Sequence, residues 1–242
     1  MSTREITDVA HHRSAGAGIV IIVAGGRGSR LGGVDKPQLI VGGQTMRARV
    51  AAAGIGALGR PVHVVVVGAP GDDLAASPFT DNGVHTAQVL EDPPFSGPVA
   101  GLAAGLERAL EDAAARADAH LAPNGALPGS TPVLILGGDM PHLTAEALRP
   151  LVNHPDREVV RSCADPTGHL QFLAAVWPLS VLRDALGTLR RPETDWQGCS
   201  MKRLYSAVPP GSITVCHVED AGAIVADVDT PDDLDRARRA AR

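Results

Sequence analysis

The stretch Val23-Ala-Gly-Gly-Arg-Gly-Ser-Arg-Leu-Gly-Gly-Val-Asp-Lys36 decides the fold of this chain. It follows an apolar run at 18–23, which is typical of a strand covered on both faces. A buried strand that ends in a glycine-rich loop allows backbone N–H groups to turn toward an anion. Arg27, Arg30 and Lys36 add positive charge to the same loop. Because a plain structural turn would not need these cations, the stretch predicts a phosphate-binding loop.

Two common nucleotide-binding motifs do not match this loop. The dinucleotide fingerprint would place its third glycine where Leu31 stands, and no acidic residue follows the second predicted strand at Val67-Gly68. The Walker A motif requires a glycine before its lysine, whereas Asp35 precedes Lys36. We therefore expect a phosphate-binding loop of another kind.

Composition favours one large α/β domain, because the chain has 242 residues of which 44% are hydrophobic. A net charge of -5 gives no general attraction to nucleic acid or to anionic membranes. No apolar run approaches the ~20 residues that span a bilayer. The polar N-terminus has no signal core, and the three cysteines form no CxxC pair. We expect a cytoplasmic protein with a disordered tail at 1–16 and one domain at 17–242.

Apolar runs and helical spacing alternate along the first half of the chain. This order predicts four βα units and a mostly parallel sheet, with ligands bound at the carboxyl ends of the strands. The predicted strands lie at 18–24, 61–67, 84–90, 132–136, 157–163, 171–177, 213–218 and 223–228. The predicted helices lie at 45–58 and 98–117, from 144 through at least Leu151, from 179 onward, at 201–205 and from 231 onward.

Two acidic residues follow predicted strands in the first half of the chain. Asp139 can cap the next helix or hold Mg²⁺ opposite the phosphate loop, since Mg²⁺ takes oxygen ligands and bridges phosphates. The next helix begins only near Thr144, which favours the metal role. Asp92 precedes Pro93, so a turn and a functional role remain equally open.

The segment Asp227-Val-Asp229 adds two carboxylates near the C-terminus. In a strand, both side chains point to the same side, because successive side chains alternate. They can reach a metal ion, or they can simply be solvated. The pattern alone favours solvation slightly.

These motifs together resemble the signature of the MobA-like nucleotidyltransferases, a family that includes molybdenum cofactor guanylyltransferases. The resemblance runs from about residue 18 to the C-terminus, with the motifs in family order. It is carried by Val23-Ala-Gly-Gly, Arg30-Leu-Gly-Gly-Val-Asp-Lys36, Glu91-Asp92, Ser96-Gly-Pro-Val-Ala-Gly-Leu102, Leu136-Gly-Gly-Asp-Met-Pro141 and Asp227-Val-Asp-Thr-Pro231.

The resemblance implies a Rossmann-like three-layer α/β/α sandwich that binds a nucleoside triphosphate and Mg²⁺. Arg30 and Lys36 would act catalytically by binding the phosphates, and Asp139 would carry Mg²⁺ and help to bind the nucleotide. Asp92 would contact the nucleotide. The main chain of one short run would hold the base and phosphates: Val23, Ala24, Gly25 and Gly26.

The activity implied is transfer of GMP from GTP to molybdopterin, with release of pyrophosphate. Two departures from the family pattern bear on this. Asp227 and Asp229 replace two asparagines, which can add charge to a metal site or mark another acceptor, and Val67-Gly68 lacks the asparagine often found in guanylyltransferases. The alternatives are a cytidylyltransferase or another NTP transferase with a different phosphorylated acceptor, and a non-catalytic protein that binds nucleotide or molybdenum cofactor.

The acceptor site is expected in the less regular second half of the chain. His169-Leu-Gln171 and Met201-Lys-Arg203 are the candidate segments, and Lys202 and Arg203 can meet an anionic pterin phosphate. A basic surface helix explains the second segment equally well.

Overall fold

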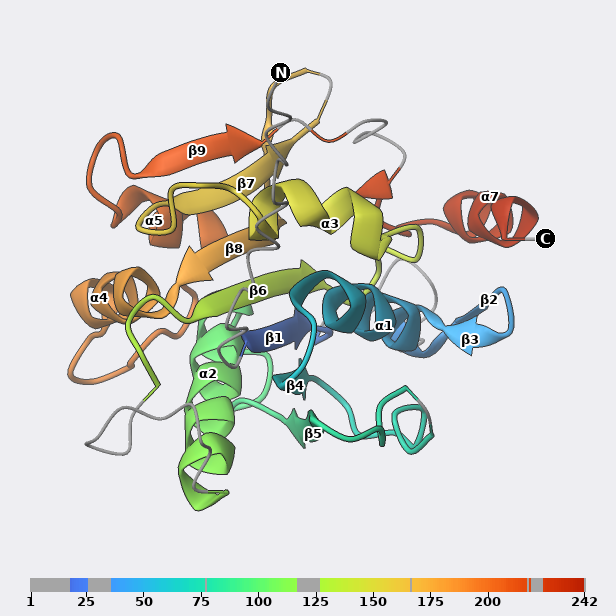
Figure 1. Cartoon of the computed structure of the whole chain (residues 1–242), viewed down its shortest axis with the longest axis horizontal. Helices are drawn as coiled ribbons and strands as arrows, with labels where there is room; N and C mark the ends of the chain where they lie inside the picture. Colours follow the sequence, from blue (N-terminus) through green and yellow to red (C-terminus); the bar gives the residue numbers. More distant parts are fainter. Residues whose placement is uncertain are drawn as a thin grey trace, which may run out of the picture.

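A computed structural model describes residues 18–25, 36–76, 78–116, 127–165, 167–216, 218 and 224–241. Within these ranges the chain forms a seven-stranded sheet with helices on both faces, and β5 and β9 lie at its two edges (Figure 1). The elements in chain order are β1 (Gly18–Val23), η2 (Lys36–Gln38), β2 (Ile40–Val41), β3 (Gln44–Thr45), α1 (Met46–Leu58), β4 (Val62–Val67), β5 (Val84–Val89), α2 (Pro98–Ala115), β6 (Pro132–Gly137), α3 (Ala145–Val152), β7 (Val160–Ala164), β8 (Leu170–Pro178), α4 (Leu179–Leu189), α5 (Met201–Ser206), β9 (Ile213–Cys216) and α7 (Pro231–Ala240).

The sheet has the strand order β5-β4-β1-β6-β8-β7-β9. The first four strands in this order are parallel, whereas β8 runs antiparallel to both β6 and β7. In the register of β1, Val23 lies opposite Val67 on one side and Gly137 on the other. The carboxyl ends of β1, β4 and β6 therefore meet at one edge of the sheet. The expected α/β/α sandwich with a mostly parallel sheet is confirmed.

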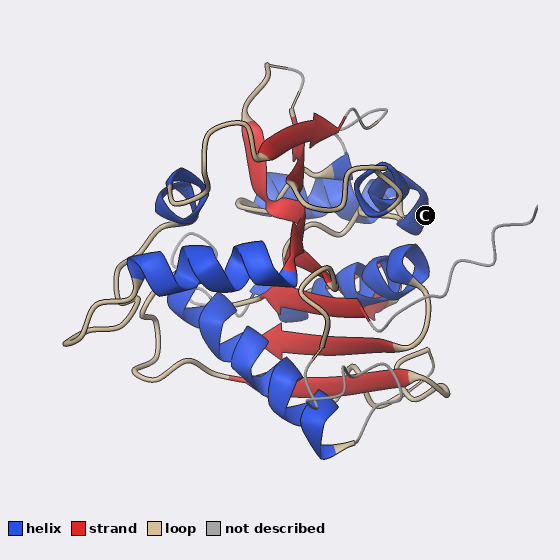
Figure 2. Ribbon diagram, turned by 60° about the vertical axis from the view of Figure 1, so that its left-hand side comes forward, coloured by secondary structure: helices blue, strands red, loops and turns tan. Residues whose placement is uncertain are grey.

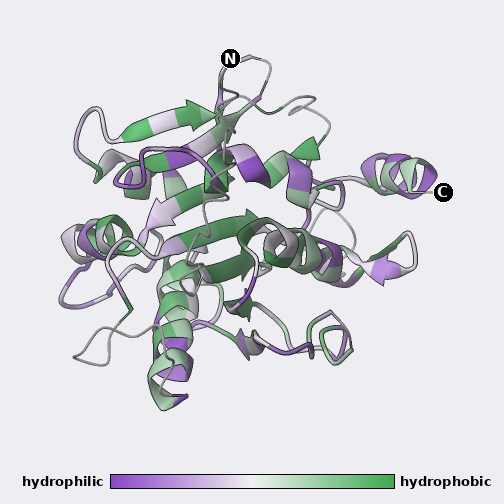
Figure 3. Ribbon diagram, viewed as in Figure 1, coloured by the Kyte–Doolittle hydropathy of each residue, from purple (hydrophilic) through white to green (hydrophobic). Residues whose placement is uncertain are grey.

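The helices cover the two faces of the sheet and form two aliphatic cores. One core joins α2, α4 and α5 to the face that carries Ile19 and Ile21, and the other joins α1 and α3 to the face that carries Val20 and Ile22. Figure 2 shows helices on both sides of the strands, and Figure 3 shows that the central strands are strongly hydrophobic. β-Branched residues suit such doubly covered strands, because their stiff side chains pack well on a pleated surface.

Threonines begin three of the helices, as the sequence indicates. Thr45 accepts a hydrogen bond from the Ala48 N–H at 3.1 Å, and Thr144 accepts one from the Ala147 N–H. Thr230 and Asp233 form a reciprocal capping box at the start of α7. These caps satisfy backbone donors that the first turn of a helix leaves unpaired.

Two predictions of secondary structure are wrong. The segment at 224–228 forms no strand: Val225 packs into the α1/α3 core, whereas Val228 packs in a small cluster with α7 and the β2–β3 hairpin. The described first half also has three βα units instead of the four expected there, because the described part of 68–83 contains no helix between β4 and β5. Side chains hold that connection: Arg47 donates to the Ala69 carbonyl at 2.6 Å, and Gln88 bonds both backbone groups of Gly71.

Arg47 is almost fully buried and pairs with Asp73 in the same connection. Burial alone would raise the pKa of Asp73, but hydrogen bonds from Arg47 and Thr45 lower it below its usual value. This pairing compensates the charge of Arg47, which would otherwise be costly to bury. It fixes the loop after β4 beside the carboxyl edge of the sheet.

Some expectations lie outside the described residues, namely the tail at 1–16 and the larger part of the phosphate loop, 26–35. Among the helices that the structure describes, none combines the length and the apolar character needed to cross a membrane.

We predict that Gly105→Ala destabilises the protein. A Cβ at Gly105 in α2 would lie 2.8 Å from Val67 and 2.9 Å from Ile21, so the helix must move away from the sheet. Such overpacking costs about 1–3 kcal/mol. In thermal unfolding, the variant should melt at a lower temperature than the wild type.

Gly187→Ala in α4 is the matched control, because nothing lies within 4 Å of its Cβ position. This variant should be neutral or slightly stabilising, since alanine favours a helix more than glycine does. Equal melting temperatures for the two variants would contradict the packing described here.

Candidate functional site

The carboxyl ends of three strands come together more closely than side chains normally allow. The ladder continues past β1 and β4: the Ala24 N–H donates to Val67 at 2.8 Å, and the Gly138 N–H donates to Val23 at 3.0 Å. A Cβ at Gly138 would lie 2.8 Å from that of Ala24, and one at Gly68 would lie 2.9 Å from the Ala24 carbonyl. Only glycine fits these two positions without a shift. The backbone of 23–25 therefore lies at the centre of the site.

Asp139 follows β6 at this edge and lies among other carboxylates. It offers an oxygen within 4.8 Å of oxygens from Asp227 and Asp229. The loop that carries these two residues is tied to the sheet, because the Val228 N–H donates to the backbone oxygen of Asp139 at 3.0 Å. The structure thus brings three of the expected residues together, although Asp227 and Asp229 lie on a loop and not on the expected strand.

The pKa of Asp139 is raised within this acidic cluster. Burial raises the pKa of Asp139 to about 6, and repulsion by Asp227 and Asp229 raises it as well, whereas its own backbone hydrogen bond and Lys36 lower it. A raised carboxylate pKa means that the ionised form is disfavoured. A cation placed here would relieve that cost.

Lys36 already supplies one positive charge to the cluster. Its Nζ lies 2.7 Å from an Asp229 carboxylate oxygen and 3.4 Å from the Asp229 backbone oxygen. Lys36 is the first residue of η2. Asp229 thus holds the lysine at the cluster.

The acidic cluster fits a magnesium ion. Mg²⁺ prefers oxygen ligands and is bound in enzymes by one or two carboxylates together with phosphates. Asp139, Asp227 and Asp229 offer such carboxylate oxygens within 4.8 Å of one another. The residues that can hold the ion are Asp139 with Asp227 or Asp229.

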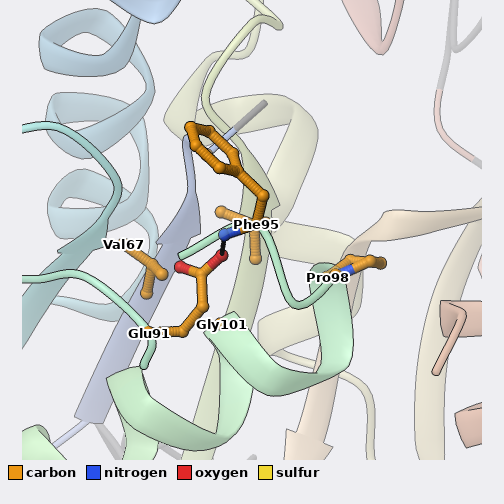
Figure 4. A pocket seen from close by; sticks show the side chains of 8 residues that line it. Val67, Glu91, Phe95, Pro98 and Gly101 are labelled. Atoms are coloured by element: carbon orange, nitrogen blue, oxygen red, sulfur yellow. Dashed lines mark hydrogen bonds between the residues drawn. The ribbon is translucent and has the colours of Figure 1, made fainter. Parts of the chain in front are cut away.

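A small pocket lies on the opposite side of β1 from Asp139. Its cavity volume is about 190 Å³, and it is lined by Val23, Gly25, Val67, Glu91, Phe95, Gly97, Pro98 and Gly101. Figure 4 shows the Glu91 carboxylate at the centre of this pocket, with one oxygen accepting a hydrogen bond from the Phe95 backbone. Val23 and Gly25 of the expected nucleotide loop thus line a small pocket.

Glu91 is a residue that sequence reasoning missed. The sequence directs attention to Asp92, which is exposed and lines a wider hollow of about 520 Å³ between α2 and 193–197. Glu91 is buried, with only 7% of its surface exposed. One feature of the sequence could have identified Glu91: it lies two residues after the end of β5, as Asp139 lies two residues after the end of β6.

Gly26 and Arg30, which the sequence predicts to bind the nucleotide, lie outside the described residues.

Of the two acceptor candidates, the segment His169–Gln171 lies at the start of β8, with His169 just before the strand. Because β8 runs antiparallel to β6, this segment lies at the same edge as Asp139. Lys202 and Arg203 are exposed on α5. Their role toward an acceptor stays a prediction.

We predict that Asp139→Asn stabilises the protein in the absence of divalent cations. The folded pKa of Asp139 is raised from 3.8 to about 6, so its ionisation destabilises the fold above pH 6, and this cost disappears as the pH falls below about 4. At pH 8 with a chelator present, the variant should melt at least about 2 °C above the wild type.

The gain should shrink between pH 6 and pH 4. The exposed Asp184→Asn on α4 serves as the control, with no gain at either pH. A loss of stability in Asp139→Asn at pH 8 would show that the cluster is not under electrostatic strain.

Comparisons with known proteins identify the family of this chain. The family model described as the MobA-like NTP transferase domain matches residues 20–203. A search of curated protein sequences found no match. Among solved structures, a Mycobacterium sp. strain JC1 homologue of the Mycobacterium tuberculosis protein Rv0371c is similar with a TM-score of 0.61 and 20% identity, covering 94% of this chain and 97% of its own.

Two further similar structures carry descriptive names. The molybdopterin-guanine dinucleotide biosynthesis protein A of Archaeoglobus fulgidus has a TM-score of 0.55 and 18% identity, covering 92% of this chain and 97% of its own. The 2-C-methyl-D-erythritol 4-phosphate cytidylyltransferase of Thermus thermophilus has a TM-score of 0.55 and 18% identity, covering 93% and 99%. These likenesses establish a shared fold. With the family match over most of its length, the chain belongs to the MobA-like NTP transferases, a nucleotidyltransferase family.

Proposed function

We propose that this protein is a Mg²⁺-dependent guanylyltransferase that transfers GMP from GTP to molybdopterin and releases pyrophosphate. One observation carries the proposal: Lys36 and the cluster of Asp139, Asp227 and Asp229 lie directly beside the backbone of 23–25 at the carboxyl edge of the sheet. A triphosphate at that edge would meet backbone donors, an ammonium group and a site for a divalent cation together.

The reaction is an in-line displacement at phosphorus. A phosphate oxygen of the acceptor forms a bond to the α-phosphorus of the triphosphate, and the bond to the bridging oxygen of pyrophosphate breaks. In such transfers the protein chiefly positions the reactants and stabilises developing charge. Mg²⁺, when bound, neutralises charge on the phosphate oxygens.

Residues of the chain supply the remaining functions. Lys36 offers a positive charge to the leaving pyrophosphate, and Asp229 keeps its ammonium group directed at the site. Arg30 adds a second cation from the phosphate loop. Asp139 can ligate the divalent ion, because a cation lowers the cost of ionising this buried carboxylate. Asp92 contacts the nucleotide from the loop after β5.

A cytidylyltransferase is the second candidate, since one similar structure is named as such an enzyme. The asparagine that guanylyltransferases of the family often carry after the second strand is absent here, and this absence leaves a cytidylyltransferase open. A Cβ at Gly68 would collide with Ala24, so no larger residue fits at that position. A different phosphorylated acceptor also remains a candidate. A non-catalytic binding protein is disfavoured, because binding alone would not require a lysine paired with one of three clustered carboxylates.

We predict that Lys36→Ala and Asp139→Ala each lower turnover by about 10²-fold or more, the usual cost of removing one electrostatic stabiliser. Pyrophosphate release from GTP, Mg²⁺ and molybdopterin measures this effect. Asp184→Ala on the exposed face of α4 is the control and should retain full activity.

Near wild-type activity in either site variant would refute these roles. Binding of nucleotide by the wild type without any pyrophosphate release, across phosphorylated pterin, sugar and alcohol acceptors, would favour the non-catalytic alternative.

A further inference from the structure

A buried ion pair joins the start of α1 to the loop after β4. Arg47 has only 1% of its surface exposed, and its Nε lies 3.1 Å and 2.8 Å from the two carboxylate oxygens of Asp73. Its Nη1 donates to the Ala69 carbonyl at 2.6 Å. Thr45, the cap of α1, donates its hydroxyl to the same Asp73 carboxylate. The guanidinium group thus bonds the loop at two points, Ala69 and Asp73.

Stability alone does not explain an ion pair at this position. Burying two charges costs desolvation energy, and apolar residues of similar volume in their place are often as stable or more stable. Arg47 also lies in the first turn of α1, where the helix dipole disfavours a cation. A guanidinium adds direction, because its planar fork fixes the place of each acceptor. The pair therefore specifies where the loop lies more than it stabilises the fold.

The loop that Arg47 holds packs on the end of β1. A Cβ at Gly68 would lie 2.9 Å from the Ala24 carbonyl and 3.1 Å from the Gly25 nitrogen, so the two backbones are in direct contact. Ala69, whose carbonyl accepts the hydrogen bond from Arg47, is the next residue. The hydrogen bond thus acts one residue away from the backbone at the centre of the site.

The same end of α1 adjoins the segment that carries Lys36. The Leu39 N–H donates to the Lys36 carbonyl at 2.9 Å, and the Met46 N–H donates to the Leu39 carbonyl at 3.0 Å. Arg47 follows Met46 directly. Figure 1 shows α1 beside the β2–β3 hairpin, with the connection from β4 to β5 below them. The start of α1 is therefore tied on one side to η2 and on the other side to the loop after β4.

We propose that the Arg47–Asp73 pair positions the backbone of the nucleotide site. It fixes the loop after β4 against the backbone of 23–25 and ties both to η2, so that the backbone donors and Lys36 keep one spacing before a triphosphate binds. Preorganisation of this kind strengthens binding, because the ligand does not have to order the loop itself. Arg47 and Asp73 contact no reactant and act through the backbone that they hold. This inference rests on the proposed function and assigns two positioning residues to it.

Arg47→Met combined with Asp73→Asn is the informative variant. It removes both charges together, so no charge is left unpaired in the protein interior. The amide oxygen of the asparagine can still accept the hydroxyl of Thr45. Removing Arg47 alone would leave the Asp73 carboxylate without its partner and would destabilise the fold itself.

Arg60→Met combined with Asp81→Asn is the matched control. This pair is also an arginine–aspartate bridge, with an N–O distance of 2.9 Å, but both side chains are exposed. Its residues precede β4 and β5, so it lies at the opposite edge of the sheet from the site. The control removes the same two charges without touching the loop after β4.

The test is calorimetric titration of the wild type and both double variants with GTP and with CTP, each with Mg²⁺. For the nucleotide that the wild type binds more tightly, the Arg47→Met/Asp73→Asn variant should bind about tenfold or more weakly, because the ligand must now order the loop. The control should bind as the wild type does. Partial unfolding cannot imitate this result, since a sample nine-tenths folded in a thermal melt raises the apparent Kd only about 1.1-fold.

Arg47→Lys is a second variant that keeps a buried cation beside Asp73. Its single ammonium group cannot bond Asp73 and Ala69 in the geometry of the guanidinium fork. It should therefore also weaken nucleotide binding, although by less than the double variant. Wild-type affinity in a folded Arg47→Lys protein would contradict the positioning role.

The outcomes separate this inference from the proposed function. If the wild type binds nucleotide and the folded Arg47→Met/Asp73→Asn variant binds it equally well, the positioning inference is wrong and the proposed reaction stands. Equal weakening in the control variant also overturns the inference, because the effect would then not depend on the loop after β4. If the wild type binds neither nucleotide, the proposed function fails and the inference fails with it.

Discussion

The close approach of three backbone segments at the carboxyl ends of β1, β4 and β6 is the constraint on which the site depends. Gly68 and Gly138 permit it, because a side chain at either position would collide with Ala24. With these segments in contact, residues that follow different strands meet within one small region. Asp139 after β6 and Glu91 after β5 thereby lie on opposite sides of the same backbone.

The two sides of β1 differ in character: one carries charged side chains, and the other carries a largely apolar pocket. On the β6 side, burial and repulsion disfavour an ionised Asp139, and Lys36 pairs with Asp229. On the β4 side, the pocket is largely apolar and contains one carboxylate. A nucleotide has the same division, since its phosphates are charged and its base is flat and mostly apolar. This match supports a nucleotide as the substrate on physical grounds.

The sequence predicted the part of the fold that local patterns control. The fully apolar runs form β1, β4 and β6. Thr45, Thr144 and Thr230 cap α1, α3 and α7, which lie where the sequence predicts helices. The strand at 223–228 failed because its apolar residues serve two different clusters, which alternation along a sequence cannot distinguish from one face of a strand. The expected fourth βα unit was wrong because the described connection from β4 to β5 contains no helix, and it is held by Arg47 and Gln88 from outside the loop.

For the site, the sequence predicted the residues whose chemistry is visible from their type and place. Asp139, Asp227 and Asp229 are brought together as a metal role requires, although the expected strand geometry of the last two was wrong. Glu91 was missed because only the three-dimensional arrangement shows its burial and its place in the pocket beside β1. The tie between Lys36 and Asp229, 193 residues apart, is likewise invisible in the sequence.

The most direct measurement of the central claim is anomalous scattering from Mn²⁺ in crystals grown with a non-hydrolysable GTP analogue. The account predicts a peak about 2.1 Å from a carboxylate oxygen of Asp139, with the phosphates beside Lys36. A triphosphate bound elsewhere on the protein, with no ion at Asp139, would contradict it.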